Sequence, residues 1–214
     1  MRIKTVIMAV GLVFAEARGA QAVTVQKSTF KNTQISMFAS LETTIDCGNG
    51  TTSTATAFVF LSGGSFVNPF GSGAGTSVDV FGFSNGCTGQ SFGDASGFIQ
   101  GGVTGPNQPL TSAQLTGTVD ASVDFGSGGT VPISLDLTFT GDGQLSSSRD
   151  TTETKTATTP SGPFTITIQR GAFRNRSADV TGTITIDGVV FPVDLTDGAT
   201  LLDNDSTTIT VDKP

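Results

Sequence analysis

Apolar and polar residues alternate along much of the chain. Every second residue from Ile35 to Leu41 is apolar, and the same phase continues to Ile45. A second alternating segment runs from Leu115 to Phe125. Successive side chains of a β-strand point to opposite faces, so a period of two predicts strands with one buried face.

Further strands are predicted from similar short patterns. They cover residues 54–61, 77–83, 131–139, 164–169, 180–186, 189–195 and 207–211, with Gly, Asn, Asp and Pro between them. No sustained apolar stripe with helical spacing occurs, and Leu, Glu and Lys are sparse. The pattern predicts an all-β fold, a two-sheet antiparallel β-sandwich, with a closed β-barrel as the alternative.

One hairpin is repeated in degenerate form, near 112–137 and 177–195. The sequence Ser-Ala-Gln-Leu-Thr-Gly-Thr-Val at 112–119 matches Ser-Ala-Asp-Val-Thr-Gly-Thr-Ile at 177–184. In the second copy, Asp187-Gly188 predicts a type I′ turn. Pro132 and Pro192 stand at matching points near strand starts, which predicts a sheet edge or a position just inside a turn. Convergent composition of Thr-rich strands is the alternative explanation.

Residues 1–22 have the order of a secretory signal. Arg2 and Lys4 precede the apolar residues 5–15, and the segment ends in Ala20-Gln21-Ala22. A bilayer span needs roughly 20 apolar residues, so this run is too short. We therefore expect residues 23–214 to form a single β-sandwich domain without a transmembrane segment, secreted to the extracellular space, the periplasm or the cell surface. An N-terminal core helix is the alternative.

The charge balance is acidic. The 214 residues carry 11 Lys and Arg and 18 Asp and Glu, a net charge of −7. Removal of residues 1–22 takes away three basic residues and one acidic residue. This leaves eight basic and 17 acidic residues, a net charge of −9. Nucleic acid is therefore not an expected partner, because its recognition needs clustered Lys and Arg.

His, Trp and Tyr are absent from the chain. Without His, a histidine base, a Ser-His-Asp triad and a histidine-ligated metal are excluded. Without Trp or Tyr, the usual aromatic platforms for sugar rings are missing.

Cys47 and Cys87 are the only cysteines. An even pair in an exported chain predicts a disulfide. A redox or metal pair is the alternative, although the two residues form no CxxC motif.

With that disulfide, the chain resembles the chaperone–usher pilins in general plan, over roughly the first third of residues 23–214. The resemblance implies a surface subunit that self-assembles through an edge strand. Residues 208–214 lack the aromatic-terminated strand of that family, so no functional residue is carried over.

Two clusters could bind ions. Asp194, Asp197, Asp203 and Asp205 could supply oxygen ligands to Ca²⁺, although they lack the EF-hand order and would otherwise be acidic turns. Arg174 and Arg176 would share a face of a strand and could clamp a carboxylate or phosphate. Pairing with the protein's own acidic groups is the favoured interpretation of both arginines.

Three further patterns have a structural and a functional interpretation. Glu42 and Glu153 are candidates for a remote hydrolase hypothesis, but nothing in the sequence brings them together. Thr152, Thr154, Thr156 and Thr158 form one row on a strand, whereas ice-binding surfaces need several parallel rows. Phenylalanines at 66, 70, 81, 83, 92 and 98 are expected to fill the core, with a recognition surface as the alternative.

These observations favour a secreted, non-enzymatic structural or binding module of the extracellular space or cell surface. The alternatives are a pilin-like assembly subunit, a calcium-dependent binding domain and, remotely, a carboxylate-dependent hydrolase. No cofactor other than Ca²⁺ is expected, and the protein is expected to be a monomer or to self-assemble through an edge strand.

Overall fold

The computed structural model describes residues 30–68, 71–107, 109–124, 129–149, 152–159, 162–169, 171–205 and 208–212. Within these ranges the regular structure is all β-strand, which confirms the predicted fold class. The predicted secretory segment, residues 1–22, lies outside them. Over the same ranges no helix has the length and apolar character needed to cross a membrane.

The strands follow the alternating segments of the sequence and extend beyond them. They are β1 (Lys31–Gly48), β2 (Thr51–Asn68), β3 (Gly71–Asn85), β4 (Gln90–Gln100), β5 (Val103–Thr104), β6 (Ser112–Asp124), β7 (Thr130–Arg149), β8 (Thr152–Thr159), β9 (Gly162–Gln169), β10 (Ala172–Ile186), β11 (Val189–Asn204) and β12 (Thr208–Asp212).

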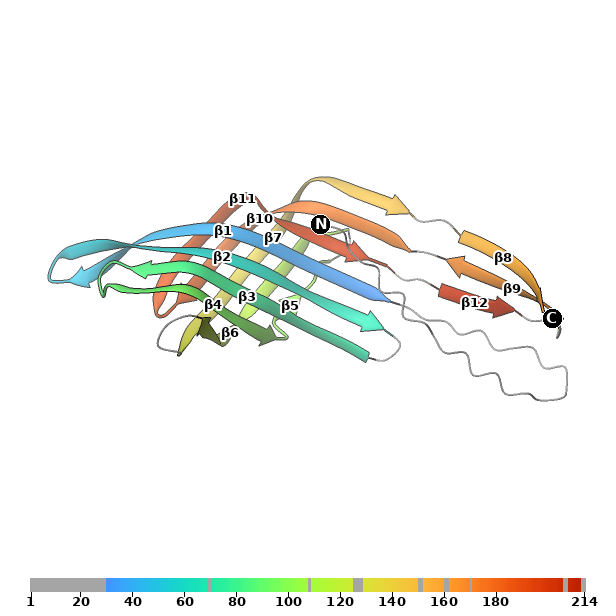
Figure 1. Cartoon of the computed structure of the whole chain (residues 1–214). Coiled ribbons are helices and arrows are strands. Elements are labelled where there is room, and N and C mark those ends of the chain that lie inside the picture. The colour runs from blue at the N-terminus through green and yellow to red at the C-terminus, as the bar shows by residue number, and fades with distance from the viewer. Residues whose placement is uncertain are drawn as a thin grey trace.

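The large sheet is antiparallel and folds over onto itself. Its nine strands have the order β4-β3-β2-β1-β11-β10-β7-β6-β5. A short pairing of Asp94–Ser96 with Ser122–Asp124 joins β4 to β6, so the sheet is ring-like. In Figure 1, β1–β4 form a layer in front of β6, β7, β10 and β11. The predicted two-layer antiparallel architecture is therefore present, with its layers connected along both sides.

The core lies between these two layers and is filled by the inward phase of each strand. On β1 the alternating residues Ile35, Met37, Ala39 and Leu41 are all buried, as the sequence predicted. Phe83 of β3 stacks on Phe92 with ring centroids 4.8 Å apart and meets Phe191 of β11 edge-on at 6.5 Å. These rings join the front layer to the back layer.

The two copies of the repeated hairpin are neighbours in the sheet. β6–β7 and β10–β11 are both antiparallel hairpins, and β7 pairs with β10. Asp187 and Gly188 have φ angles of 49° and 78°, as a type I′ turn requires. Pro192 pairs with Thr183 of β10, while the pairing of β1 with β11 begins only at Ala199. Its missing N–H therefore faces an unpaired side, as the sequence predicted for an edge position.

Three strands form a separate small sheet, in the order β12-β9-β8. It continues the β11, β10 and β7 part of the large sheet beyond the body of the molecule (Figure 1). Residues 146–159 form the end of β7 and the edge strand β8, apart from 150 and 151, which lie outside the described ranges.

Cys47 and Cys87 form a disulfide with a Cα–Cα distance of 5.1 Å across 40 residues of sequence, as predicted. Cys47 is the penultimate residue of β1, next to the β1–β2 turn, and Cys87 lies in the turn between β3 and β4. The bond therefore ties the tips of two consecutive hairpins together. Such bonds are typical of an oxidising compartment.

Candidate functional site

Four phenylalanines lie on the outer surface of the β1–β4 layer. They are Phe38 of β1, Phe58 and Phe60 of β2, and Phe81 of β3, here called the phenylalanine face. Their neighbours in sequence on β2, Ala57, Val59 and Leu61, are buried. Because the strand alternates, filling the inward positions with these small and aliphatic residues leaves the larger rings facing solvent.

The register of the strands makes these four rings a continuous block. Phe38 lies directly opposite Phe60, and Phe58 lies directly opposite Phe81. Side chains at such paired positions have Cβ atoms about 5 Å apart, and residues two apart on one strand share a face. Their exposed fractions are 62% for Phe38, 45% for Phe58, 38% for Phe60 and 41% for Phe81. Contiguous exposed apolar surface of this kind marks interaction sites.

Two other exposed phenylalanines have a structural role in the same layer. The ring of Phe98 lies over Gly75, where a Cβ atom would overlap it, and the ring of Phe66 lies over Gly73 in the same way. Each ring therefore covers backbone that a neighbouring glycine leaves bare.

The expectation that phenylalanines 66–98 fill the core is wrong for Phe66, Phe81 and Phe98, which are exposed. Phe83 is buried and Phe92 packs partly against the core, while Phe70 lies outside the described residues. Phe66 and Phe98 occupy outward positions of their strands, which remain outward whatever residue fills them. Phe81 and the buried Phe83 are two residues apart but face opposite sides, because the alternation is interrupted at Gly82, which has a φ of 62° and lies where β3 shifts register against β2. Sequence reasoning also overlooked the three phenylalanines on β1 and β2, although the alternation that placed Ile35 and Met37 inside already placed Phe38 outside.

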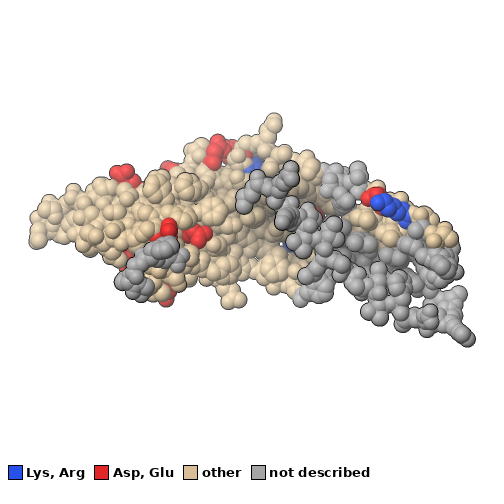
Figure 2. Space-filling model, in the orientation of Figure 1, with Lys and Arg blue, Asp and Glu red and all other residues tan. Residues whose placement is uncertain are grey.

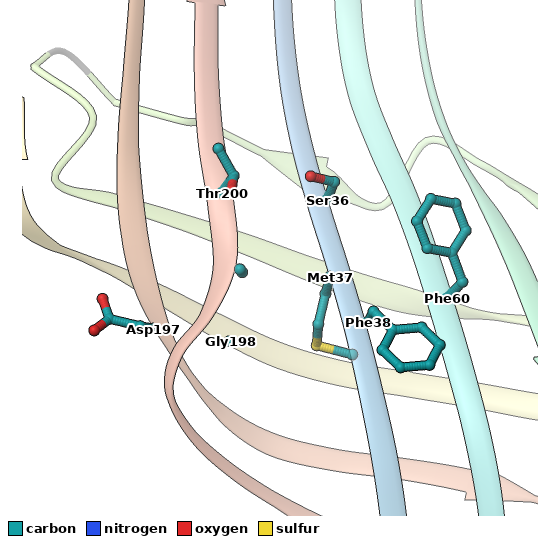
Figure 3. Close-up of a pocket in the computed structure, with 8 residues that line it drawn as sticks. Ser36, Met37, Phe38, Phe60, Asp197, Gly198 and Thr200 are labelled. Carbon is teal, nitrogen blue, oxygen red and sulfur yellow. The ribbon is translucent and has the colours of Figure 1, made fainter. Parts of the chain in front are cut away.

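A shallow depression of about 210 Å³ borders the phenylalanine face, between β2, β1 and β11. Its lining includes Ser36, Phe38, Phe60, Asp197 and Thr200. Figure 3 shows the two rings side by side on β1 and β2, and the Asp197 carboxylate on β11 pointing away from them. The depression therefore has the two phenylalanine rings on one side and Asp197 on the opposite side.

Carboxylates are interspersed with the rings. Asp79 of β3 lies opposite Phe60, and Asp94 of β4 lies opposite Phe81. The Ser77 hydroxyl donates a hydrogen bond of 3.2 Å to Asp79. Figure 2 shows this side of the molecule as a mainly uncharged surface with acidic groups scattered over it.

The predicted calcium ligands do not gather at one point in the structure. Asp203 is buried and accepts a hydrogen bond of 3.2 Å from Arg174, and Asp205 lies 3.8 Å from the same guanidinium. Asp194 is exposed on β11. The calcium prediction itself remains a prediction.

Asp197 belongs instead to a different carboxylate group. It lies with Asp142 and Asp179, and the three carboxylate oxygens are within 4.8 Å of one another. The backbone N–H of Asp197 donates a hydrogen bond of 3.0 Å to Asp179. The group is located where β10 and β11 slip in register, between Ala178 and Val180, a feature that strand patterns in the sequence do not reveal.

The two arginines of the predicted anion clamp contact groups of the protein itself. Arg174 pairs with Asp203 and Asp205, and the Arg176 Nε–H donates to the Asp142 carbonyl oxygen at 3.1 Å. The Arg174 pair links β10 to β11.

The two glutamates of the hydrolase hypothesis lie on different sheets. Glu42 is on the exposed face of β1, and Glu153 is on β8, where it pairs with Lys155 at 2.7 Å.

The row of threonines on β8 does not stand alone. Thr154 lies opposite Thr167 of β9, which lies opposite Thr210 of β12. In the next registers along the strands, Thr156 faces Thr165, and Thr152 and Thr208 both face Gln169. Directly opposed residues share a face of a sheet. The following residues therefore form one threonine array: Thr152, Thr154, Thr156, Thr158, Thr165, Thr167, Thr208 and Thr210.

Comparison with known proteins does not connect the chain to a family. No family model matches it, and no curated protein matches it. Among solved structures, it is similar to a protein from Nitrosomonas europaea that carries the provisional name AttH, with 11% identity and a TM-score of 0.31. The match covers 84% of this chain and 51% of the other, so this chain spans about half the length of that protein. A similarity this low carries no argument about function.

Proposed function

We propose that this protein is an exported, non-enzymatic binding module whose recognition surface is the phenylalanine face. The observation that carries the proposal is the position of Phe38, Phe58, Phe60 and Phe81 side by side and exposed. The disulfide supports export, because such bonds persist in oxidising compartments.

The cost of keeping these rings in water supports a binding role. A partner that covers all four would remove on the order of 300 Å² of apolar surface from water. This corresponds to on the order of 8 kcal/mol before the costs of association are subtracted. The β-sheet beneath is held by backbone hydrogen bonds on both sides of β2, which makes it a rigid platform.

A peptide-display selection on purified residues 23–214 tests the proposal. We expect peptides that enrich on the wild-type protein to be retained at least tenfold less by the double variant Phe60→Ser, Phe81→Ser. Because both side chains face solvent, the melting temperature should change little. The matched control is Val190→Ser, which alters an exposed apolar residue of β11, outside the phenylalanine face. This variant should retain the peptides. Equal retention by the double variant would remove the phenylalanine face as the binding surface.

We infer a second candidate function from the threonine array, contact with the ordered water of an ice surface. Strands lie about 4.8 Å apart, and residues two apart on a strand are about 6.7 Å apart, so the array repeats hydroxyl and methyl groups in two dimensions. Only three strands contribute, so the twist of the sheet accumulates over only two strand-to-strand steps, and the array stays flatter than that of a larger sheet.

Inhibition of ice recrystallisation is the measurement for this second function. We expect micromolar protein to slow the growth of ice grains, and Thr167→Lys in the middle of the array to abolish the effect. Thr118→Lys places the same charge on an exposed position of β6 and should have no effect. Ice grains that grow as in buffer with the wild-type protein would eliminate the idea.

A further inference from the structure

We propose that the phenylalanine face binds a cationic, arginine-containing segment of another protein. This inference rests on the proposed function, and it adds the chemistry of the partner. Its basis is the sign of the charges that surround the four rings.

The charges on this layer are almost all negative. Glu42, Asp46, Asp79 and Asp94 lie in β1–β4, and the only basic residue of those four strands is Lys31, at the first position of β1. At the seam with the other layer, the backbone register sets the acidic position 124 of β6 opposite Asp94. An acidic surface attracts cationic partners and repels anionic ones, including nucleic acid and anionic membranes.

Two of the four rings have an aspartate directly opposite them on the next strand. Phe60 is opposite Asp79, and Phe81 is opposite Asp94, so in each pair the Cβ atoms of a phenylalanine and an aspartate are about 5 Å apart on neighbouring strands. An arginine can stack its planar head on a ring and direct its N–H groups to a nearby carboxylate. The face contains two such pairs, and each pair includes one residue of β3.

A second copy of this chain does not fit the same surface. It would bring another Asp79 and Asp94 against the first set and add like charge to residues 23–214, whose net charge is already −9. A cationic segment neutralises these carboxylates and covers the rings with the apolar stems of its own side chains.

Fluorescence anisotropy with three labelled ten-residue peptides tests the charge requirement. The peptides alternate Val with Arg, Gln or Glu, and are titrated with purified residues 23–214. We expect the Arg peptide to bind at least tenfold more tightly than the Gln peptide, and the Glu peptide not to bind. The double variant Asp79→Asn, Asp94→Asn should bind the Arg peptide at least fivefold more weakly than the wild-type protein does. Its affinity for the Gln peptide should be unchanged.

The control variant Asp120→Asn, Asp136→Asn removes the same charge from exposed positions on β6 and β7. It should change the affinity for the Arg peptide less than twofold. An equal effect of the two double variants would mean general attraction to an acidic protein and would overturn the inference, as would equal binding of the Arg and Gln peptides or no binding of the Arg peptide.

Loss of Gln peptide binding in Phe60→Ser, Phe81→Ser, combined with no preference for Arg, would leave the proposed function standing while this inference fails. Binding of all peptides that is insensitive to the phenylalanine variant would remove both.

Discussion

Replacing Phe83 with alanine is expected to lower the free energy of unfolding by about 3–5 kcal/mol. Phe83 is 1% exposed, stacks on Phe92 and meets Phe191 of the opposite layer. The substitution removes a ring that joins both layers, and close-packed neighbours cannot collapse fully into the space. Equilibrium unfolding in urea measures the change.

Two further variants make this result interpretable. Phe83→Leu retains most of the volume, and we expect it to cost less than half as much, so that a measurable protein is available if the alanine variant does not fold. Phe38→Ala, on the outer face of the same layer, is expected to change stability by less than about 1 kcal/mol. Equal losses for Phe38→Ala and Phe83→Ala would contradict the inward and outward phases of the strands.

Loss of the disulfide should have a similarly large effect. We expect the double variant Cys47→Ser, Cys87→Ser to be less stable by about 4 kcal/mol, because the bond closes a segment with a sequence separation of 40 and restricts the unfolded chain. The strands on both sides of it remain paired in the folded protein, so the fold itself should survive. Urea unfolding with circular dichroism reports both quantities.

Reduction of the wild-type protein provides the matched control for the disulfide prediction. Wild-type protein in dithiothreitol should unfold at the same urea concentration as the double variant, within error. A stability loss below about 1 kcal/mol in both cases would show that the bond contributes little beyond the two hairpins it connects.

Local patterns in the sequence were sufficient for much of the fold. The alternation at 35–45 predicted which side of β1 is buried, and Asp187-Gly188 predicted the turn between β10 and β11. Both features depend on residues a few positions apart. The disulfide followed from an even number of cysteines in a chain that reads as exported.

The candidate site was less accessible to that reasoning. Phe38 and Phe60 are 22 positions apart in sequence, and Phe60 and Asp79 are 19 apart, so only the strand register makes them neighbours. Likewise, the pairing of β7, β10 and β11 placed Asp142 and Asp179 beside Asp197, rather than gathering the four aspartates of residues 194–205.

The alternation of apolar and polar residues determined by itself that the chain forms strands and, where the alternation is regular as in β1, which side of the strand is buried, because that property depends on neighbouring residues alone. The tertiary structure decided how those strands are ordered. It set Phe58 against Phe81 and joined Thr154, Thr167 and Thr210 into one array. These contacts depend on pairing across long stretches of chain, where closing the loops and packing a common core select one register among many that the local pattern allows.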